Sequence, residues 1–356
     1  MMREDIRFVF PAGPDDKRVL LVEANSCHAE VLPGLAKHLV DLGHTVCVLV
    51  NNADSANVFY RFEGDMVKVD VLGTESIGRV LRDKRVKNFK RVVIASHHVY
   101  HFVPKIPNPL PIEDFYKGFI IETLAPVCMV HDPFFIKTAY LQSSDRIISL
   151  LGASPHEKPS PPLFVNAHYF GKIKTHPKAT PCVFTIVGNI AASRRNVNLI
   201  FDACDYLYKA RKMDFRVFII GAGSLEIPEK HKGHITMFGR LSWETMFNRL
   251  DESDFILAML DPDNSAQDVY TRKASGSYNL AYGFQKPIII HKKFTSISRF
   301  TNKNSIIYDR VDGLGSAMLK AVEMSSGDYS VMTSELAVLS EQLRTESLRN
   351  FSEVLL

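Results

Sequence analysis

Short apolar runs alternate with helix-like segments through the first half of the chain. Residues 19–23 and 44–50 are apolar enough for buried strands, and residues 30–42 between them place four aliphatic side chains at helical spacing before Gly43. We therefore expect a strand–helix–strand unit whose crossover is parallel and right-handed. Further strands are predicted at residues 91–95, 127–130 and 146–151, and a helix at residues 115–124.

These strands are short and apolar on both faces, as in a parallel sheet covered by helices. In such sheets, functional groups collect at the carboxyl ends of the strands. Three of these ends carry imidazoles, although a single histidine in a loop is more often only solvated. The polar residues at these ends are Asn25, His28, Ser96, His97, His98, His131 and Asp132.

A second alternation follows a proline-rich stretch. Residues 153–181 hold six prolines and few consecutive apolar residues, so we expect a linker there. Beyond it, the same pattern predicts another sheet with helices. The expected strands are residues 182–187, 215–220, 235–238, 255–259 and 288–290, and the expected helices are 197–209, 242–250 and the chain from 326 on.

The composition supports two globular domains and limits the partners. With 356 residues the chain exceeds one ordinary core, and 46% hydrophobic with 23% charged residues is typical of a folded, soluble protein. The net charge of +4 is small for this length and argues against a nucleic-acid partner. The N-terminus lacks the pattern of a signal peptide and no stretch of about 20 apolar residues occurs, so we expect a cytoplasmic protein.

The cysteines give no sign of a metal or disulfide framework. They lie far apart in apolar contexts, without a Cys-x-x-Cys pair or a histidine at metal-binding spacing. We expect buried free thiols in a reducing compartment. The five are Cys27, Cys47, Cys128, Cys182 and Cys204.

Residues 270–290 contain the strongest sign of a ligand site. Arg272 and Lys273 precede the sequence Ser275-Gly276-Ser277, where a weakly amphipathic helix is expected to begin. The first backbone amides of a helix have no intrahelical partner and lie at the positive end of its dipole, which suits a phosphate group. The alternative is an ordinary helix capped by a serine.

Two glycine-containing loops follow predicted strands. Arg194 and Arg195 lie between Gly188 and the next helix, where their planar donor groups suit a diphosphate, and two solvated arginines are the alternative. In the second loop, which begins Gly221-Ala222-Gly223, Glu226 stands where a dinucleotide-binding fingerprint has its third glycine. A nicotinamide site is therefore not expected there.

The order of these pieces resembles a GT-B glycosyltransferase, in which two Rossmann-like halves are joined by a linker. The second half is similar to the large retaining family, family four, that includes sucrose synthases and bacterial cell-envelope transferases. The resemblance rests on residues 188–196, 215–223, 235–241, 275–281 and 286–289, and in the first half on residues 42–46 and 130–133.

The resemblance implies an α/β fold of two Rossmann-like domains, with a C-terminal helix that crosses back to the first. The acceptor domain would be residues 1–152, the linker 153–181, the nucleotide-sugar donor domain 182–335 and the helix 336–356. The implied contacts to the donor diphosphate are Gly188, Asn189, Arg194, Arg195, Lys273, Ser275, Gly276 and Ser277, and those to the base and ribose are Gly221, Gly239, Arg240 and Leu241.

One departure from this family concerns its acids. Many members carry two glutamates that orient the donor, and the corresponding positions here hold Arg272 and Leu280. An acid nearby would have to replace them, or donor activity is lost. The acids considered are Asp261, Asp263 and Asp268.

Glycosyl transfer develops positive charge on the sugar and negative charge on the departing diphosphate. The arginines, Lys273 and the helix amides supply positive partners without a metal. Asp261-Pro262-Asp263 has the spacing of a metal-binding pair, but a turn at a strand end explains it better. We expect no cofactor beyond a sugar nucleotide, such as a UDP- or GDP-sugar, as the substrate.

The acceptor is expected across the cleft, against the first domain near Asn25, His28 and His98. For catalysis, two chemistries remain open. In a retaining reaction His97 or His131 would contact the transferring sugar, whereas in an inverting one Glu30 or Asp132 would act as the base.

A basic run suggests a further partner. Residues 79–91 hold seven cations and one acid, which would attract an anionic membrane surface or a charged glycan. As a helix, the run has only a thin apolar stripe of Val80, Val86 and Phe89, so a solvated basic face is the alternative.

Together these patterns predict a metal-independent, hexosyltransferase-like enzyme. It would transfer a sugar from a nucleotide sugar to a glycan or lipid-linked acceptor in bacterial surface polysaccharide synthesis, on the inner face of the cytoplasmic membrane. The alternatives are a non-catalytic binding or scaffold protein of the same fold and, with less support, a nucleotide-sugar epimerase.

Overall fold

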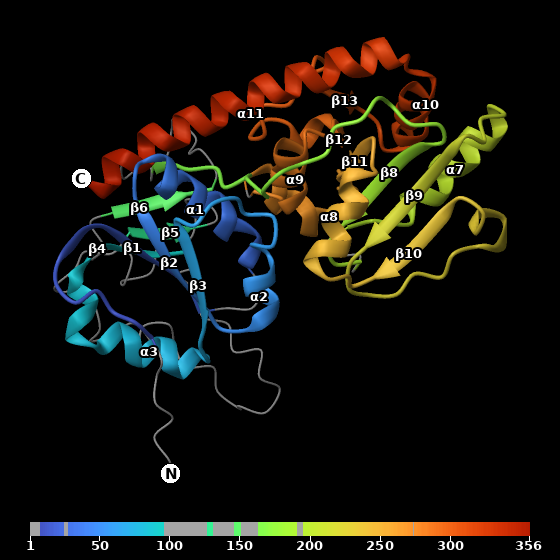
Figure 1. The fold of residues 1–356 in the computed structure, drawn as a ribbon. Helices are drawn as coiled ribbons and strands as arrows, with labels where there is room; N and C mark the ends of the chain where they lie inside the picture. Colours follow the sequence, from blue (N-terminus) through green and yellow to red (C-terminus); the bar gives the residue numbers. More distant parts are fainter. Residues whose placement is uncertain are drawn as a thin grey trace. The chain divides into compact units, whose positions relative to one another are not determined.

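The computed structural model describes residues 8–24, 28–95, 127–130, 146–150, 163–190, 195–272 and 274–356. The chain divides into two compact units (Figure 1). The N-terminal unit comprises Met1–Lys172 and Leu343–Leu356, and the C-terminal unit comprises Ile173–Gln342. The proline-rich stretch is therefore shared between them.

A parallel sheet forms the core of the N-terminal unit. In its described part the strands follow the order β3-β2-β1-β4-β5-β6-β7, and every hydrogen-bonded pair is parallel. The apolar runs of the central strands, at residues 19–23, 46–50 and 92–94, are buried, as expected for a sheet covered on both faces. The strands are β1 (Asp15–Glu23), β2 (Thr45–Val50), β3 (Val67–Val71), β4 (Phe89–Ile94), β5 (Val127–Val130), β6 (Arg146–Ser149) and β7 (Leu163–Phe164).

Short helices connect these strands. The predicted helix at residues 30–42 is a 3₁₀ turn, η1 (Ala29–Val31), followed by α1 (Leu32–Asp41), whose first turn contains Pro33. Gly34 in α1 lies against residue 167, and a Cβ at position 34 would be 2.5 Å from the Ala167 carbonyl carbon. The remaining helices described between β2 and β4 are α2 (Ala53–Asn57), α3 (Thr74–Arg82) and the 3₁₀ segment η2 (Lys84–Asn88).

The C-terminal unit contains a second parallel sheet, of order β10-β9-β8-β11-β12-β13. Its core packs Phe184, Phe215 and Phe255 with aliphatic residues from the flanking helices. The strands are β8 (Cys182–Val187), β9 (Phe215–Ile220), β10 (Ile235–Gly239), β11 (Phe255–Leu257), β12 (Ile288–His291) and β13 (Ser305–Tyr308).

Helices connect these strands in turn. They are α7 (Leu199–Lys209), α8 (Trp243–Asp251), α9 (Gly276–Phe284) and α10 (Leu314–Glu323), with the 3₁₀ segments η4 (Glu229–His231), η5 (Ser265–Thr271), η6 (Lys292–Phe294) and η7 (Val311–Gly313). The last helix, α11 (Ser326–Leu355), is long and belongs to both units (Figure 1).

The end of α11 is bonded to the N-terminal unit. Arg146 donates to the Val354 carbonyl at 2.6 Å, and the Asn166 amide donates to Ser347 Oγ at 2.8 Å. The expected C-terminal helix that returns to the first domain is thus confirmed. Within the ranges described, no helix combines the length and the apolar character needed to cross a bilayer.

The predicted α/β class with two parallel sheets is confirmed. The helix predicted at 115–124 and Cys27 lie outside the described residues, whereas the other four cysteines are buried free thiols. Strands β3, β7 and β13 and helices α2 and α10 were not predicted, and β7 lies within the expected linker. The basic run is not one helix, because α3 ends at Arg82 and Asp83 caps η2 by accepting from the Arg85 amide.

Candidate functional site

The strand order of the C-terminal unit indicates where a ligand crevice is expected. All of its paired strands are parallel, so their carboxyl ends share one edge of the sheet, called here the carboxyl edge. Strands β8 and β11 are neighbours, although β9 and β10 lie between them in sequence. In open α/β sheets, ligands bind at such a reversal of strand order. The loops after β8 and β11 and the N-termini of α7 and α9 lie at this edge.

Three predicted glycines form a row along the carboxyl edge. Gly188, Gly221 and Gly239 follow or end β8, β9 and β10, and all have positive φ angles. The Gly221 amide donates to the Gly239 carbonyl at 2.9 Å, and a Cβ on Gly221 would lie 1.8 Å from the Gly188 carbonyl oxygen. Gly221 is therefore needed for close backbone packing. These three positions carry no side chain, so each presents only backbone atoms at the carboxyl edge.

Arg195 joins the two strands at the reversal. Its Nη1 donates to the Ala258 carbonyl, just beyond β11, at 2.7 Å. Its Nε would lie 2.7 Å from a Cβ on Gly188, so the guanidinium packs directly on that glycine. Burial lowers the pKa of Arg195, and the nearby phenols of Tyr270 and Tyr278 oppose this effect. Arg195 makes no ion pair with a carboxylate among the residues that the structure describes.

Asn196 extends the same connection. Its backbone amide donates to the Met259 carbonyl at 3.1 Å, and its side-chain amide donates to the Asp261 carboxylate at 2.8 Å. Met259 has a φ angle of +52°, which is strained for a side chain of this size. The residues after β11 are thus held in an unusual backbone conformation by the loop after β8. Of the three acids considered as replacements, Asp261 contacts the described part of this loop, through Asn196.

The first turn of α9 has the features expected of a phosphate site. Ser275 is the N-cap residue, but its side chain does not cap the helix. Gly276 is exposed, with open space where a Cβ would stand. Ser277 is 1% exposed, and its Oγ is buried without a hydrogen-bond partner in the described structure. A buried hydroxyl without a partner is unfavourable, and a bound acceptor would satisfy it.

Contacts of Arg195 link this turn to the crevice. Tyr278, the residue after Ser277, is an electrostatic neighbour of the Arg195 guanidinium and donates its own hydroxyl to the Phe294 carbonyl at 3.1 Å. Neither Tyr278 nor Tyr270 was predicted from the sequence as a site residue. Their positions in sequence, Tyr270 in η5 and Tyr278 in the first turn of α9, were the available signal.

The structure describes only some of the remaining residues predicted for the donor site. Asn189 lies in the loop after Gly188, and Arg240 and Leu241 follow β10 at the carboxyl edge. Arg194 and Lys273 lie outside the described residues. At the positions of the family's glutamates, Arg272 is exposed and Leu280 is buried in α9. Asp268 pairs with Lys293 at 2.6 Å.

In the N-terminal unit, the predicted groups are mostly outside the described residues: Asn25, His97, His98, His131 and Asp132. The two that are described lie together after β1. His28 Nδ1 is 3.9 Å from the Glu30 carboxylate, and both side chains are partly exposed. No group of three metal-binding side chains is found within the described ranges.

Comparison with known proteins gives a shared fold. No protein-family model and no curated protein sequence matches this chain. Among solved structures, a glycosyltransferase from Rickettsia africae ESF-5 matches with a TM-score of 0.57 at 10% identity, over 96% of this chain and 98% of that one. Sucrose-phosphate synthase from Thermosynechococcus elongatus matches with a TM-score of 0.53 at 10% identity, over 95% and 96%.

A third structure is AviGT4, a glycosyltransferase involved in avilamycin A biosynthesis. It matches with a TM-score of 0.50 at 14% identity, over 94% of this chain and 97% of that one. The neighbours span nearly the full chain, and the two-sheet architecture is the GT-B fold of glycosyltransferases. At these identities the likeness concerns the fold, and function must be argued from the site.

Proposed function

We propose that the protein is a glycosyltransferase that takes its sugar from a nucleotide-sugar donor bound at the carboxyl edge of the C-terminal unit. The observation that carries this proposal is the first turn of α9. It combines a buried, unpartnered Ser277 hydroxyl, an uncapped helix start and open space at Gly276. Arg195, a partly buried cation without a carboxylate partner in the described structure, is close to the same turn through Tyr278.

The site suits a departing diphosphate. Helix amides and a hydroxyl donate hydrogen bonds to phosphate oxygens, and a fixed guanidinium nearby favours the negative charge that grows as the glycosidic bond breaks. Arg195 is already held by Ala258, so its charge is oriented before the substrate arrives. Arg194 and Lys273 would add further positive charge, and no cofactor is required. The glycine row beside β9 and β10 would receive the base and ribose.

The acceptor side of the proposal rests on the N-terminal unit. A glycan or lipid-linked acceptor would lie near Asn25, His28 and His98. His97 or His131 would contact the sugar if the reaction retains configuration, and Glu30 or Asp132 would act as base if it inverts. Synthesis of a bacterial surface polysaccharide is the proposed context.

Membrane contact belongs to this proposal. Five cations of the basic run are exposed on α3 and η2, whereas the run's apolar residues are buried in the core of the unit. The acid in the run, Asp83, is paired with Arg85 at 2.8 Å. This surface fits anionic headgroups by charge alone, so salt should weaken binding. Co-sedimentation without preference for anionic over neutral vesicles would remove this part. The exposed cations are Arg79, Arg82, Lys84, Arg85 and Lys87.

A non-catalytic binding protein is the second candidate. It is favoured by Leu280, which is buried where related enzymes have a glutamate, and by the engagement of Asp268 with Lys293. Asp261 is the acid that would take over donor orientation in an active enzyme. Its carboxylate accepts from Asn196 and from the Asp263 amide at 2.9 Å, which fixes its direction.

Thermal-shift screening against UDP, GDP, CDP and their sugars tests the donor site. We expect at least one of these ligands to raise the melting temperature of the protein. Ser277→Ala should weaken the binding of that ligand by about 10- to 100-fold, as expected when a hydrogen bond to a charged group is lost. Ser277→Ala should not lower the melting temperature of the free protein, because Oγ has no hydrogen-bond partner to lose among the described residues. Ser305→Ala, a buried serine that begins β13, is the matched control and should leave ligand binding unchanged.

Turnover separates the candidates. Release of free nucleoside diphosphate only when an acceptor extract is added indicates a transferase. Conversion of the sugar nucleotide without an acceptor indicates an epimerase. Binding without either reaction indicates the non-catalytic protein, and no stabilisation by any nucleotide contradicts a donor site.

A further inference from the structure

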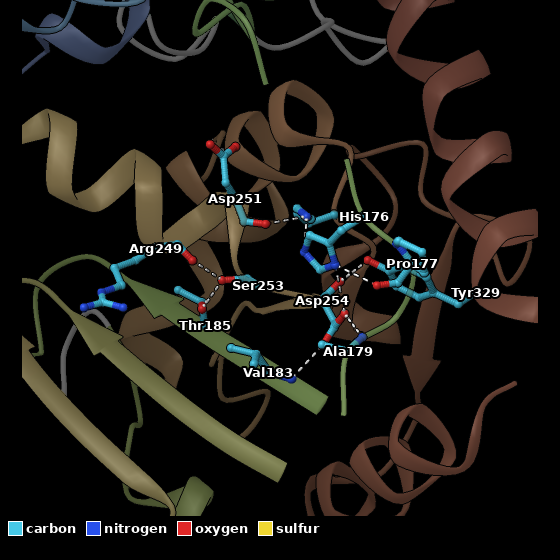
Figure 2. A network of polar contacts seen from close by, with 11 residues as sticks. His176, Pro177, Ala179, Val183, Thr185, Arg249, Asp251, Ser253, Asp254 and Tyr329 are labelled. Carbon is cyan, nitrogen blue, oxygen red and sulfur yellow. Dashed lines mark hydrogen bonds and ion pairs between the residues drawn. The ribbon is translucent and has the colours of Figure 1, made fainter. Parts of the chain in front are cut away.

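A buried network of charged groups lies at the opposite edge of the C-terminal sheet, where the strands begin (Figure 2). It is built on the turn between α8 and β11, residues 251–254. Asp254 is fully buried, and its carboxylate accepts from the backbone amides of Ala179 at 2.9 Å and Val183 at 2.7 Å. This edge is remote in topology from the proposed donor site, which the carboxyl ends form.

The same turn holds two segments that lead to the other unit. The Lys174 amide donates to Asp251 at 3.1 Å, so both ends of the segment 174–179 are fixed by carboxylates of the turn. Tyr329, at the start of α11, donates its hydroxyl to the Asp254 carbonyl at 3.0 Å. Since the units divide after Lys172 and again within α11, this turn anchors both chain connections on the C-terminal side.

Lys286 lies inside the network. It is 2% exposed, and its Nζ donates to the Asp251 carbonyl at 3.0 Å and lies 3.1 Å from His176 Nε2. Burial lowers the pKa of Lys286 to about 8, although the charges of Asp254 and Asp251 oppose this. Near neutral pH the ammonium group is therefore charged and donates its protons to both partners.

The contacts of His176 define its protonation. Its Nδ1 is 2.7 Å from the Pro177 carbonyl, which can only accept, so Nδ1 carries a proton. Nε2 must then be the lone-pair acceptor for Lys286. A second proton on the ring would direct an N–H at the ammonium group. With this geometry, His176 and Lys286 cannot both be charged.

We propose that His176 and Lys286 form a proton-sensitive latch that holds the segment 174–179 on the C-terminal unit and releases its middle part when the imidazole takes up a proton. Acidification then places two donors and two positive charges opposite each other. The backbone bonds at Lys174 and Ala179 stay in place, while the residues between them detach. The latch regulates a connection between the units and does not depend on the ligand proposed above.

Other charged groups on the surrounding elements do not provide this response. Tyr329 and Cys182 stay neutral between about pH 5 and 8, because burial raises the pKa of both. Arg249 pairs with Glu252 at 2.7 Å on the outside of the turn, and Lys178 donates to the Val322 carbonyl at 2.7 Å. Asp254 lies 3.8 Å from His176 Nδ1 and would hold the protonated ring at that side only. Lys174, the other charged residue considered beside His176, is exposed to solvent.

NMR relaxation of the intact protein tests the latch, because it reports backbone motion whether or not an amide is hydrogen-bonded. The backbone order parameters of Thr175, His176 and Lys178 should fall from about 0.85 at pH 7.5 to below about 0.6 at pH 5.5, the values typical of rigid and flexible backbone. His176→Gln keeps an acceptor for Lys286 and a donor for Pro177 but cannot be protonated, so it should abolish this decrease. His234→Gln is the control, because His234 also bonds a carbonyl, that of Phe215, and contacts no lysine among the residues that the structure describes.

A second variant tests the same contact from its other side, in case His176→Gln disturbs the fold. Lys286→Met removes the charge that opposes a protonated His176, so the decrease in order parameters at residues 175, 176 and 178 should also disappear, while order parameters elsewhere in the unit stay unchanged. If the wild-type protein and His176→Gln show the same pH dependence of the order parameters at residues 175, 176 and 178, or if His234→Gln abolishes it, the proposal is wrong.

Discussion

Replacing Lys286 with methionine should change how the stability of the C-terminal unit depends on pH. The side chain is 2% exposed, and its pKa is about 8 instead of 10.5. Its charged form is therefore less favourable in the folded than in the unfolded protein, and the difference in pKa corresponds to about 3 kcal/mol. Lys286→Met removes this titration and keeps most of the apolar volume.

The sign follows from proton binding. Below pH 8 the folded and the unfolded protein both keep the proton of Lys286, so this group adds no slope. Between pH 8 and 10.5 the unfolded chain holds a proton that the folded protein loses. The free energy of unfolding of the wild type should therefore rise with pH relative to Lys286→Met, by up to about 1.4 kcal/mol per pH unit and about 3 kcal/mol in total.

Urea unfolding at pH 7, 8, 9 and 10 measures this difference. The single tryptophan, Trp243, begins α8, so its fluorescence reports on the C-terminal unit. Subtracting the variant from the wild type cancels the titration of tyrosines and other lysines. Lys303→Met, at an exposed lysine, should show no pH-dependent difference from the wild type. Parallel curves for the wild type and Lys286→Met would refute the buried, charged state of Lys286.

Three substitutions test the packing of the glycines and the arginine. Gly221→Ala should destabilise the protein by more than about 1 kcal/mol in urea unfolding, because its Cβ would overlap the Gly188 carbonyl and φ is +151°. Gly276→Ala should leave the melting temperature unchanged, because nothing lies within 4 Å of the new Cβ, so a large decrease would contradict the open helix start. Arg195→Met should lower the melting temperature through the lost bond to Ala258, and should also weaken nucleotide binding in calorimetry; a loss of stability alone would make Arg195 purely structural.

The sheets were predictable from the sequence because their strands are buried on both faces. Runs such as residues 182–187 and 215–220 coincide with β8 and β9 without adjustment. The helix start at Ser275 was predictable because serine and glycine favour such positions. Strand β3 was missed because none of its residues is fully buried, so its hydrophobic pattern is weak.

Contacts between distant residues were beyond the sequence pattern. Arg195 looked like a solvent-facing ligand residue, yet it also bonds a carbonyl 63 positions away. Lys286 looked like a polar residue before a strand, yet it is buried and contacts His176, 110 positions earlier. Local periodicity gives no signal for either partner. The unpartnered state of Ser277 Oγ likewise follows from the packing of its neighbours.

The most direct measurement of the donor site is an NMR titration of the backbone amides at the start of α9. On addition of the nucleoside diphosphate that stabilises the protein best, the amide protons of Gly276 and Ser277 should shift downfield and saturate with one ligand per chain, as expected for hydrogen bonds to phosphate. Saturating nucleotide that leaves both amides unshifted, while shifting residues elsewhere, would contradict the proposed diphosphate site.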